Sequence, residues 1–178
     1  MSTADLLIIS SNPAYNATEY YPTEDWCDND IINFFQERLN NVYYQSTVFY
    51  KHIIKYASWI LSISQDDPII TQKICTVNTI HCKSSKEKDG TANCWNYCVQ
   101  KWMKQILDQF NGRYILLHGS YAKKLQLICE QYNKIIFYLP HYAAHSSLTD
   151  NDKKVLIDNV KMNVSNNDLF NYNNTIIR

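Results

Sequence analysis

The chain has 178 residues, of which 46% are apolar and 19% are charged, and its 17 basic residues balance its 17 acidic residues. This length predicts one domain with a buried core. The balanced charge excludes a basic field over the whole surface, so an affinity for nucleic acid would have to come from a local patch. No apolar run reaches the length of a membrane span and no signal peptide precedes Met1, which predicts an intracellular protein of the cytoplasm, nucleoid or nucleus.

Short apolar runs rich in β-forming residues alternate with segments of helical spacing. In chain order we predict a strand at Leu6–Ser10, helices at Asp30–Leu39 and Ser46–Ile63, a strand at Lys73–Ile80, a helix at Asn93–Phe110, a strand at Tyr114–His118, a helix at Ser120–Tyr132, a strand at Lys134–Leu139 and a helix at Thr149–Val160. In the helix at 93–110 the predicted buried stripe is Val99, Met103, Ile106 and Phe110, and Gly112 is the predicted C-cap.

Strands that alternate with helices imply βαβ crossovers. We therefore predict a three-layer α/β/α domain with a central four-stranded parallel sheet over residues 1–165, and a loose, Asn-rich tail over residues 166–178.

Ligands of parallel sheets bind beyond the carboxyl ends of the strands. The stretches at these ends are SSNPAYN, VNTIHCK, HGSYAKK and PHYAAHSS. They place Asn12, Asn78, Gly119 and His141 along one predicted edge, although these residues are far apart in the sequence.

Three features carry a resemblance to a known family. LLIISSNPAYNA resembles a strand followed by Gly-x-Asn-Pro-Gly, TVNTIHCKSSKEKDGTANCWNYC resembles a Thr-Asn-Val-x-Lys-Cys region, and RYILLHGSYAKKL with LPHYAAHSSL resembles a strand-Leu-Gly-x-x-Ala segment and a closing His-Pro-Ser-Pro or His-Pro-Ala-Ala motif. In this order, from about Leu6 to Leu148, they resemble the uracil-DNA glycosylase superfamily, with motifs like those of its mismatch-specific, single-strand-selective and iron–sulphur branches. The chain departs from the family pattern at Ser10 and Ala14, where glycines are usual, and at Tyr142, where proline is usual.

The resemblance implies a uracil-DNA glycosylase-like fold and hydrolysis of the N-glycosidic bond of uracil, or of a related damaged base, in DNA. In this interpretation Asn12 positions the attacking water and Asn78 reads the base, since one carboxamide offers both a donor and an acceptor. A ring N–H of His141 stabilises the leaving anion, with His145 as a competitor for this role. Each of these residues also has an ordinary structural interpretation, as a strand-end asparagine or a turn residue.

The same interpretation implies a stacking wall and a DNA-binding surface. The base-binding candidates besides Asn78 are Ser11, Tyr21 and Trp26. The DNA-binding candidates are Ser120, Lys123, Ser146, Ser147 and Leu148, the last as a wedge in the gap left by the flipped base. The lysines can equally belong to solvated loops.

Of the six cysteines, Cys94 and Cys98 lie one helical turn apart, and Cys82 precedes them. An iron–sulphur cluster or a zinc ion at these three thiols is an alternative, but the spacing matches no common zinc module and a cluster needs a fourth cysteine. We therefore expect no metal or other cofactor, and reduced thiols.

Two other functions stay open. The lost glycines and Tyr142 favour a superfamily member that binds DNA or a nucleobase without cleaving it. A nucleotide-binding enzyme of doubly wound type is the third alternative, weakened because no Gly-rich phosphate loop follows the first strand.

Overall fold

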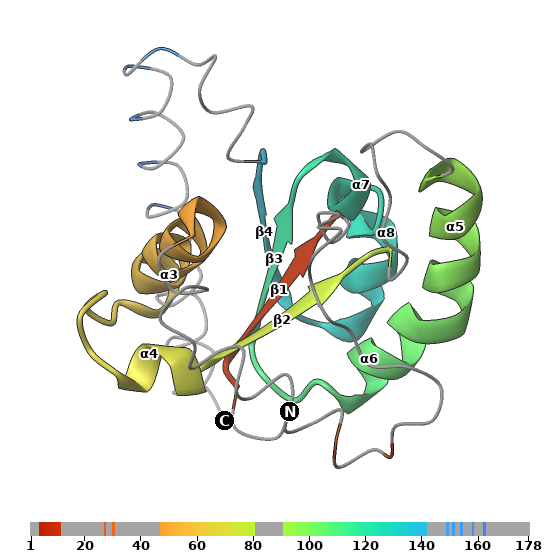
Figure 1. The fold of residues 1–178 in the computed structure, drawn as a ribbon, viewed down its shortest axis with the longest axis horizontal. Helices are drawn as coiled ribbons and strands as arrows, with labels where there is room; N and C mark the ends of the chain where they lie inside the picture. Colours follow the sequence, from red (N-terminus) through yellow and green to blue (C-terminus); the bar gives the residue numbers. More distant parts are fainter. Residues whose placement is uncertain are drawn as a thin grey trace, which may run out of the picture.

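The computed structural model describes residues 4–11, 27, 30, 47–80, 91–141, 149, 151, 154, 158 and 162. Its centre is a sheet of four parallel strands in the order β2-β1-β3-β4 (Figure 1). The strands are β1 at Leu6–Ser10, β2 at Ile74–Asn78, β3 at Tyr114–His118 and β4 at Ile135–Leu139. The prediction of an α/β fold with a four-stranded parallel sheet is confirmed, and the bounds of β1 and β3 are those predicted.

Helices surround this sheet. They are α3 at Val48–Leu61, α4 at Ile69–Gln72, α5 at Thr91–Cys98, a π-helical turn η1 at Val99–Met103, α6 at Lys104–Gln109, α7 at Ser120–Lys123, α8 at Gln126–Cys129 and a 3₁₀ turn η2 at Glu130–Tyr132. Helix α3 starts where predicted to within two residues, because the Thr47 side chain caps it by accepting a hydrogen bond from the backbone N–H of Tyr50. The short helix α4, which follows Pro68, was not predicted.

Helices lie on both faces of the sheet (Figure 1), and an apolar cluster fills the space between the strands and the helices on each face. On the α3 face, alternate strand residues such as Leu6 and Leu116 pack against one side of α3. On the opposite face, which we call the α5–α8 face, the intervening residues such as Leu7 and Leu117 pack against the helices from α5 to α8. The described elements thus form three layers, because successive side chains of a strand point to opposite faces.

The predicted helix at 93–110 is continuous but contains the π-helical turn η1. The wider turn shifts the buried stripe, so Leu107 is buried and the predicted Ile106 is only half-buried. The prediction of Gly112 as the C-cap is wrong, since α6 ends at Gln109 and Phe110 follows in an extended conformation. Gly112 is instead required by space, because a Cβ atom there would clash with the Ala4 carbonyl oxygen and the Phe110 ring.

The predicted helix at 120–132 is divided into α7, α8 and η2. Hydrogen bonds that span three residues, from the Leu125 N–H to the Ala122 carbonyl and from the Ile128 N–H to the Leu125 carbonyl, tighten the chain here. As a result Ala122, Leu125 and Cys129 are all fully buried against the α5–α8 face.

Of the helix predicted at Asp30–Leu39, only Asp30 is described, and it is helical; the predicted tail at 166–178 lies outside the described residues. Residues 151, 154 and 158 are helical, within the helix predicted at 149–160. None of the helices in the described ranges has both the length and the apolar character needed to cross a bilayer.

Candidate functional site

Three of the four strands end in a polar residue, and these residues lie side by side. Ser10 at the end of β1 is paired in register with Asn78 of β2 and with His118 of β3. The alternation of the strands places all three on the α3 face, in line with Leu6, Ile74 and Tyr114. The carboxyl edge of the sheet thus presents an amide, a hydroxyl and an imidazole in one row.

His118 is the most enclosed member of this row, with no solvent-exposed surface. Its Nδ1 atom lies 3.4 Å from the Ser10 hydroxyl oxygen, a hydrogen bond whose direction depends on the tautomer. From α3, the ring of Tyr56 approaches to 5.7 Å and that of Phe49 to 6.1 Å between centroids. A buried imidazole held by a hydroxyl and two aromatic rings has little rotational freedom.

His141, the predicted catalytic histidine, stacks on His118. The ring centroids are 5.1 Å apart and the ring planes differ by 24°. Gly119 lies beside this stack: a Cβ atom there would clash with Ser11 Oγ at 2.8 Å and would make an ordinary contact of 3.6 Å with His141 Cβ. Gly119 also has a φ of +96°, in the region that favours glycine. Gly119 therefore lies close to both the predicted Ser11 and the predicted His141, and its missing side chain leaves room for Ser11.

Backbone hydrogen bonds fix the edge on both sides of β1. The N–H and the hydroxyl of Thr79 both donate to the Ser10 carbonyl, at 2.7 and 2.6 Å. The Ile80 N–H donates to the Ser11 carbonyl at 3.0 Å, and the Gly119 N–H donates to the Leu139 carbonyl at 2.9 Å. These bonds hold the segments that carry Asn78 and His141 in a constant relation to β1 and β3.

A third histidine borders the site from α3. His52 Nδ1 lies 3.4 Å from the phenol oxygen of Tyr56. Burial, followed by the charges of Lys55 and His141, lowers the pKa of His52. Burial also raises the pKa of Tyr56, so its phenol stays protonated at neutral pH. The charge of His141 thus acts on His52 across the site.

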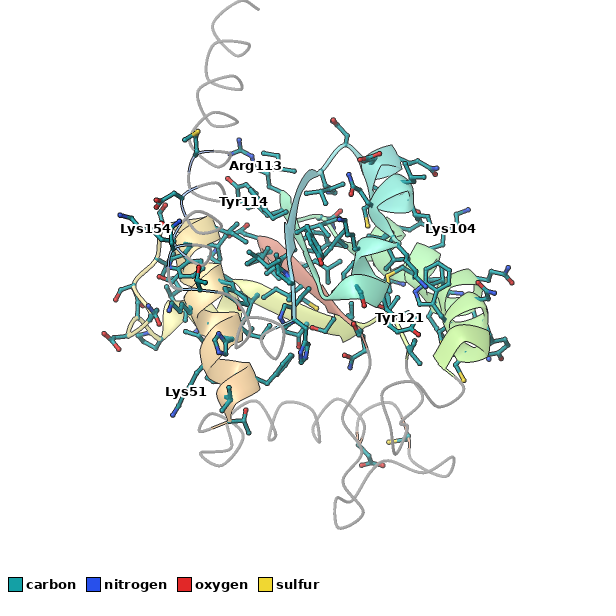
Figure 2. All side chains as sticks on the ribbon, turned by 90° about the horizontal axis from the view of Figure 1, so that it is seen from above. Lys51, Lys104, Arg113, Tyr114, Tyr121 and Lys154 are labelled. Atoms are coloured by element: carbon teal, nitrogen blue, oxygen red, sulfur yellow. The ribbon has the colours of Figure 1, made fainter. Side chains whose placement is uncertain are left out.

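The predicted DNA-binding residues Ser120 and Lys123 are the first and last residues of α7, and both are exposed. The ammonium group of Lys123 lies 4.6 Å from the centre of the Tyr138 ring. The neighbouring Lys124 lies over the rings of Tyr121 and Trp95. In Figure 2, Tyr121 and Lys104 lie on the side of the molecule away from Lys51 of α3. The lysines of α7 thus border the same edge of the sheet from the α5–α8 side.

The structure brings four of the predicted residues together at this edge: Asn78, Ser11, Gly119 and His141. The remaining predicted site residues, and one predicted metal ligand, lie outside the described residues: Asn12, Tyr21, Trp26, Ser146, Ser147, Leu148 and Cys82.

The other two cysteines of the alternative metal site are on α5, where Cys94 is half-buried and Cys98 is buried. No group of three or more histidine, cysteine or acidic side chains suited to a metal ion occurs in the described part of the chain. Both cysteines are thiols, as are Cys27, Cys75 and Cys129. Burial raises the pKa of Cys129 to about 12 and also raises that of Cys75, so neither thiol is activated as a nucleophile.

Sequence reasoning missed His118, Ser10 and His52 as members of the site. A signal was present for the first two, since each is a polar residue that ends an otherwise apolar strand, in LLIIS and YILLH. His52 gave no such signal, because it lies within a helix and reaches the site only through the packing of α3.

In comparisons with family models, with curated proteins and with solved structures, no match to this chain was found.

Proposed function

We propose that this protein is a uracil-DNA glycosylase-like enzyme that hydrolyses the N-glycosidic bond of uracil, or of a related damaged base, in DNA. The observation that carries the proposal is the meeting of Asn78, Ser11 and His141 at the carboxyl edge of a parallel sheet, with His141 stacked on a buried imidazole. This is the edge at which parallel sheets bind ligands.

The chemistry requires two groups that these residues can supply. The base is rotated out of the DNA stack, and the Asn78 carboxamide pairs with its O4 and N3–H edge. As the bond between C1′ and the base nitrogen breaks, its electron pair moves to the base, and a ring N–H of His141 stabilises the resulting anion at O2. A water molecule then forms the new C1′–O bond and releases its proton. Asn12, which follows Ser11 in the sequence, is the residue we propose to position that water.

The site contains no carboxylate among the described residues of the edge, from Ser10 and Ser11 to Asn78, Thr79, His118 and His141. An amide is too weak a base to remove a proton from water efficiently. The rate enhancement would therefore rest on alignment of the water and on stabilisation of the leaving base.

The proposal also gives α7 a role. Ser120 at its first turn and Lys123 at its last are exposed at the edge of the site, and hydroxyl and ammonium groups suit contacts with phosphates. DNA would thus approach from the carboxyl edge of the sheet, with the flipped base pointing toward Asn78.

The same edge would also suit a second function, binding of DNA or a nucleobase without cleavage, because none of its described residues is a carboxylate that could act as a base. Ser10 and Ser11 are only 4% and 5% exposed, and His118 is not exposed at all. These side chains thus form the interior of the edge in the described arrangement, which leaves the contact with a ligand to Asn78, His141 and the flanking loops.

The test is an incubation of the purified protein with labelled single- and double-stranded oligonucleotides that carry one uracil, followed by alkali treatment and detection of strand cleavage. The variants Asn78→Ala and His141→Ala are measured in parallel, with Gln126→Ala on the exposed side of α8 as a control. We expect cleavage that is lost in both site variants and kept in the control. Binding of uracil-DNA without cleavage would favour the second function, and neither binding nor cleavage would refute both.

A further inference from the structure

We propose that His118 is a positioning residue that holds the ring of His141 in the orientation in which it contacts the departing base. The inference rests on the proposed function, but its central claim concerns the arrangement of two rings and can be tested without catalysis. It assigns a role to a residue that neither the sequence motifs nor the proposed chemistry uses.

The first argument is the burial of His118. A histidine is rarely enclosed completely, because the imidazole loses its contacts with water. His118 is nevertheless the last residue of the central strand β3 and has no exposed surface. A leucine, as at the two preceding positions of β3, would fill this place without loss of hydration. The imidazole therefore provides something at this position that an aliphatic side chain does not.

The second argument is the stack itself. Centroids 5.1 Å apart and planes that differ by 24° put one face of His141 against His118, within the range of favourable aromatic pairs. A ring held by its face directs its two nitrogen atoms along the ring plane, away from His118. His141 follows Pro140, two residues after the end of β4, and is half-buried, so contacts such as the stack on His118 orient its ring.

The third argument is that His118 is itself held. Ser10 contacts its Nδ1 atom, and Tyr56 and Phe49 pack against it from α3. The orientation of His141 thus depends on the contacts that His118 makes with Ser10 of β1 and with α3. A loop residue supported in this way resembles the second layer of contacts that makes active sites precise.

The test compares the wild-type protein with His118→Phe, which keeps a flat ring in the stack, and His118→Ala, which removes it. Ile115→Val is the control, because it weakens the buried core at the same strand on the other face. Two quantities are measured: the NMR signals of the His141 ring over a pH titration, and the single-turnover rate on a uracil oligonucleotide as a function of pH.

We expect His118→Ala to shift the His141 ring signals and to lower the single-turnover rate on the order of 10²-fold, with DNA affinity nearly unchanged, since misplacement of a catalytic group by about 1 Å has this effect. His118→Phe should restore most of the rate, because it keeps a flat ring in the stack. Ile115→Val should change neither the ring signals nor the rate.

Identical His141 signals in the wild-type protein and in the His118 variants would overturn the inference, whether or not the protein cleaves DNA. So would a rate in His118→Ala equal to that of the control. If His118→Ala does not fold, His118→Leu, which fills the space without an aromatic face, replaces it, and His141 ring signals and a rate equal to those of the wild type would also overturn the inference. An inactive wild-type protein would refute the proposed function alone, while the ring signals would still decide the role of His118.

Discussion

The two faces of the sheet are built from the same strands but differ at the carboxyl edge. On the α3 face, the final residues of β2, β1 and β3 are Asn78, Ser10 and His118. On the α5–α8 face, the residues just before them, such as Ile9 and Leu117, are apolar and fully buried. Both faces have a closed apolar core, but only the α3 face carries polar side chains from the strands to the edge.

This difference follows from strand length and the two-residue period. Each strand has five residues, so its first, third and fifth side chains share a face. A polar residue in the fifth position of neighbouring strands then creates a polar row without any interruption of the apolar core below it. A polar row can therefore end such a sheet without interrupting its apolar core. The two faces should respond alike to core mutations and differently to mutations at the edge.

The largest expected effect tests the similarity of the two cores. Leu116→Ala on the α3 face and Leu117→Ala on the α5–α8 face each remove a fully buried side chain, so each should lower the free energy of unfolding by about 2–5 kcal/mol. Urea denaturation would measure these free energies, provided that the variants and the wild-type protein have equal m-values. A loss below about 1 kcal/mol in one variant alone would show that one of the two faces is not a closed core.

A smaller effect is expected at Gly119, where the two segments of the site meet. Gly119→Ala places a Cβ atom 2.8 Å from Ser11 Oγ at a φ of +96°, and should cost about 1–3 kcal/mol and reduce cleavage or binding of uracil-DNA. Thermal unfolding and the oligonucleotide assay measure the two consequences.

The control for this prediction is Gly112→Ala at the other end of β3. Its Cβ atom would clash with Ala4 and Phe110, so it should also destabilise the protein. Under conditions in which both variants are folded, only Gly119→Ala should impair activity. Equal activity in the two variants would show that Gly119 has no specific role in the site.

A still smaller effect on stability is expected for Lys123→Gln. Its contact with the Tyr138 ring contributes about 0.5–1 kcal/mol. If Lys123 contacts a phosphate, the variant should weaken DNA binding and reduce the slope of log affinity against log salt by about 1. Fluorescence anisotropy over a salt series measures this slope.

Lys101 provides a matched control, since its ammonium group makes similar contacts with the rings of Tyr97 and Trp102 in α5 and η1. Lys101→Gln should change stability to a similar degree and leave the salt slope unchanged. Equal salt slopes for both variants and the wild-type protein would show that Lys123 of α7 does not contact DNA.

The smallest expected effect is a pH dependence from His52. Its pKa in the folded protein is lowered from the ordinary value of 6.5, mainly by burial. Below 6.5 the unfolded chain therefore binds a proton before the folded protein does, so stability is complete above this pH and is lost as the pH falls toward the pKa of the folded state. Urea midpoints between about pH 7.5 and pH 5 should decline less in His52→Gln than in the wild-type protein, and an equal decline would exclude His52 as the source.

The sequence by itself determined the strands and their order along the chain. LLIIS and YILLH are short apolar runs that end in a polar residue, so the bounds of β1 and β3 follow from composition alone. The alternation with helices was enough to predict a parallel sheet. It was also enough to place Asn78 and His141 at one edge, because all strands of a parallel sheet end on the same side.

Other features depend on packing between segments that are distant in the sequence, and they became visible only in the folded chain. Because of the π-helical turn η1, Leu107 is buried and the predicted Ile106 is only half-buried, and no local pattern in the sequence predicts such a turn. The four-residue helix α4 is too short to leave a periodic signal. The pairing of His118 with His141 depends on the adjacency of β3 and β4. Local propensity identifies the elements, but only the packed chain determines which side chains meet.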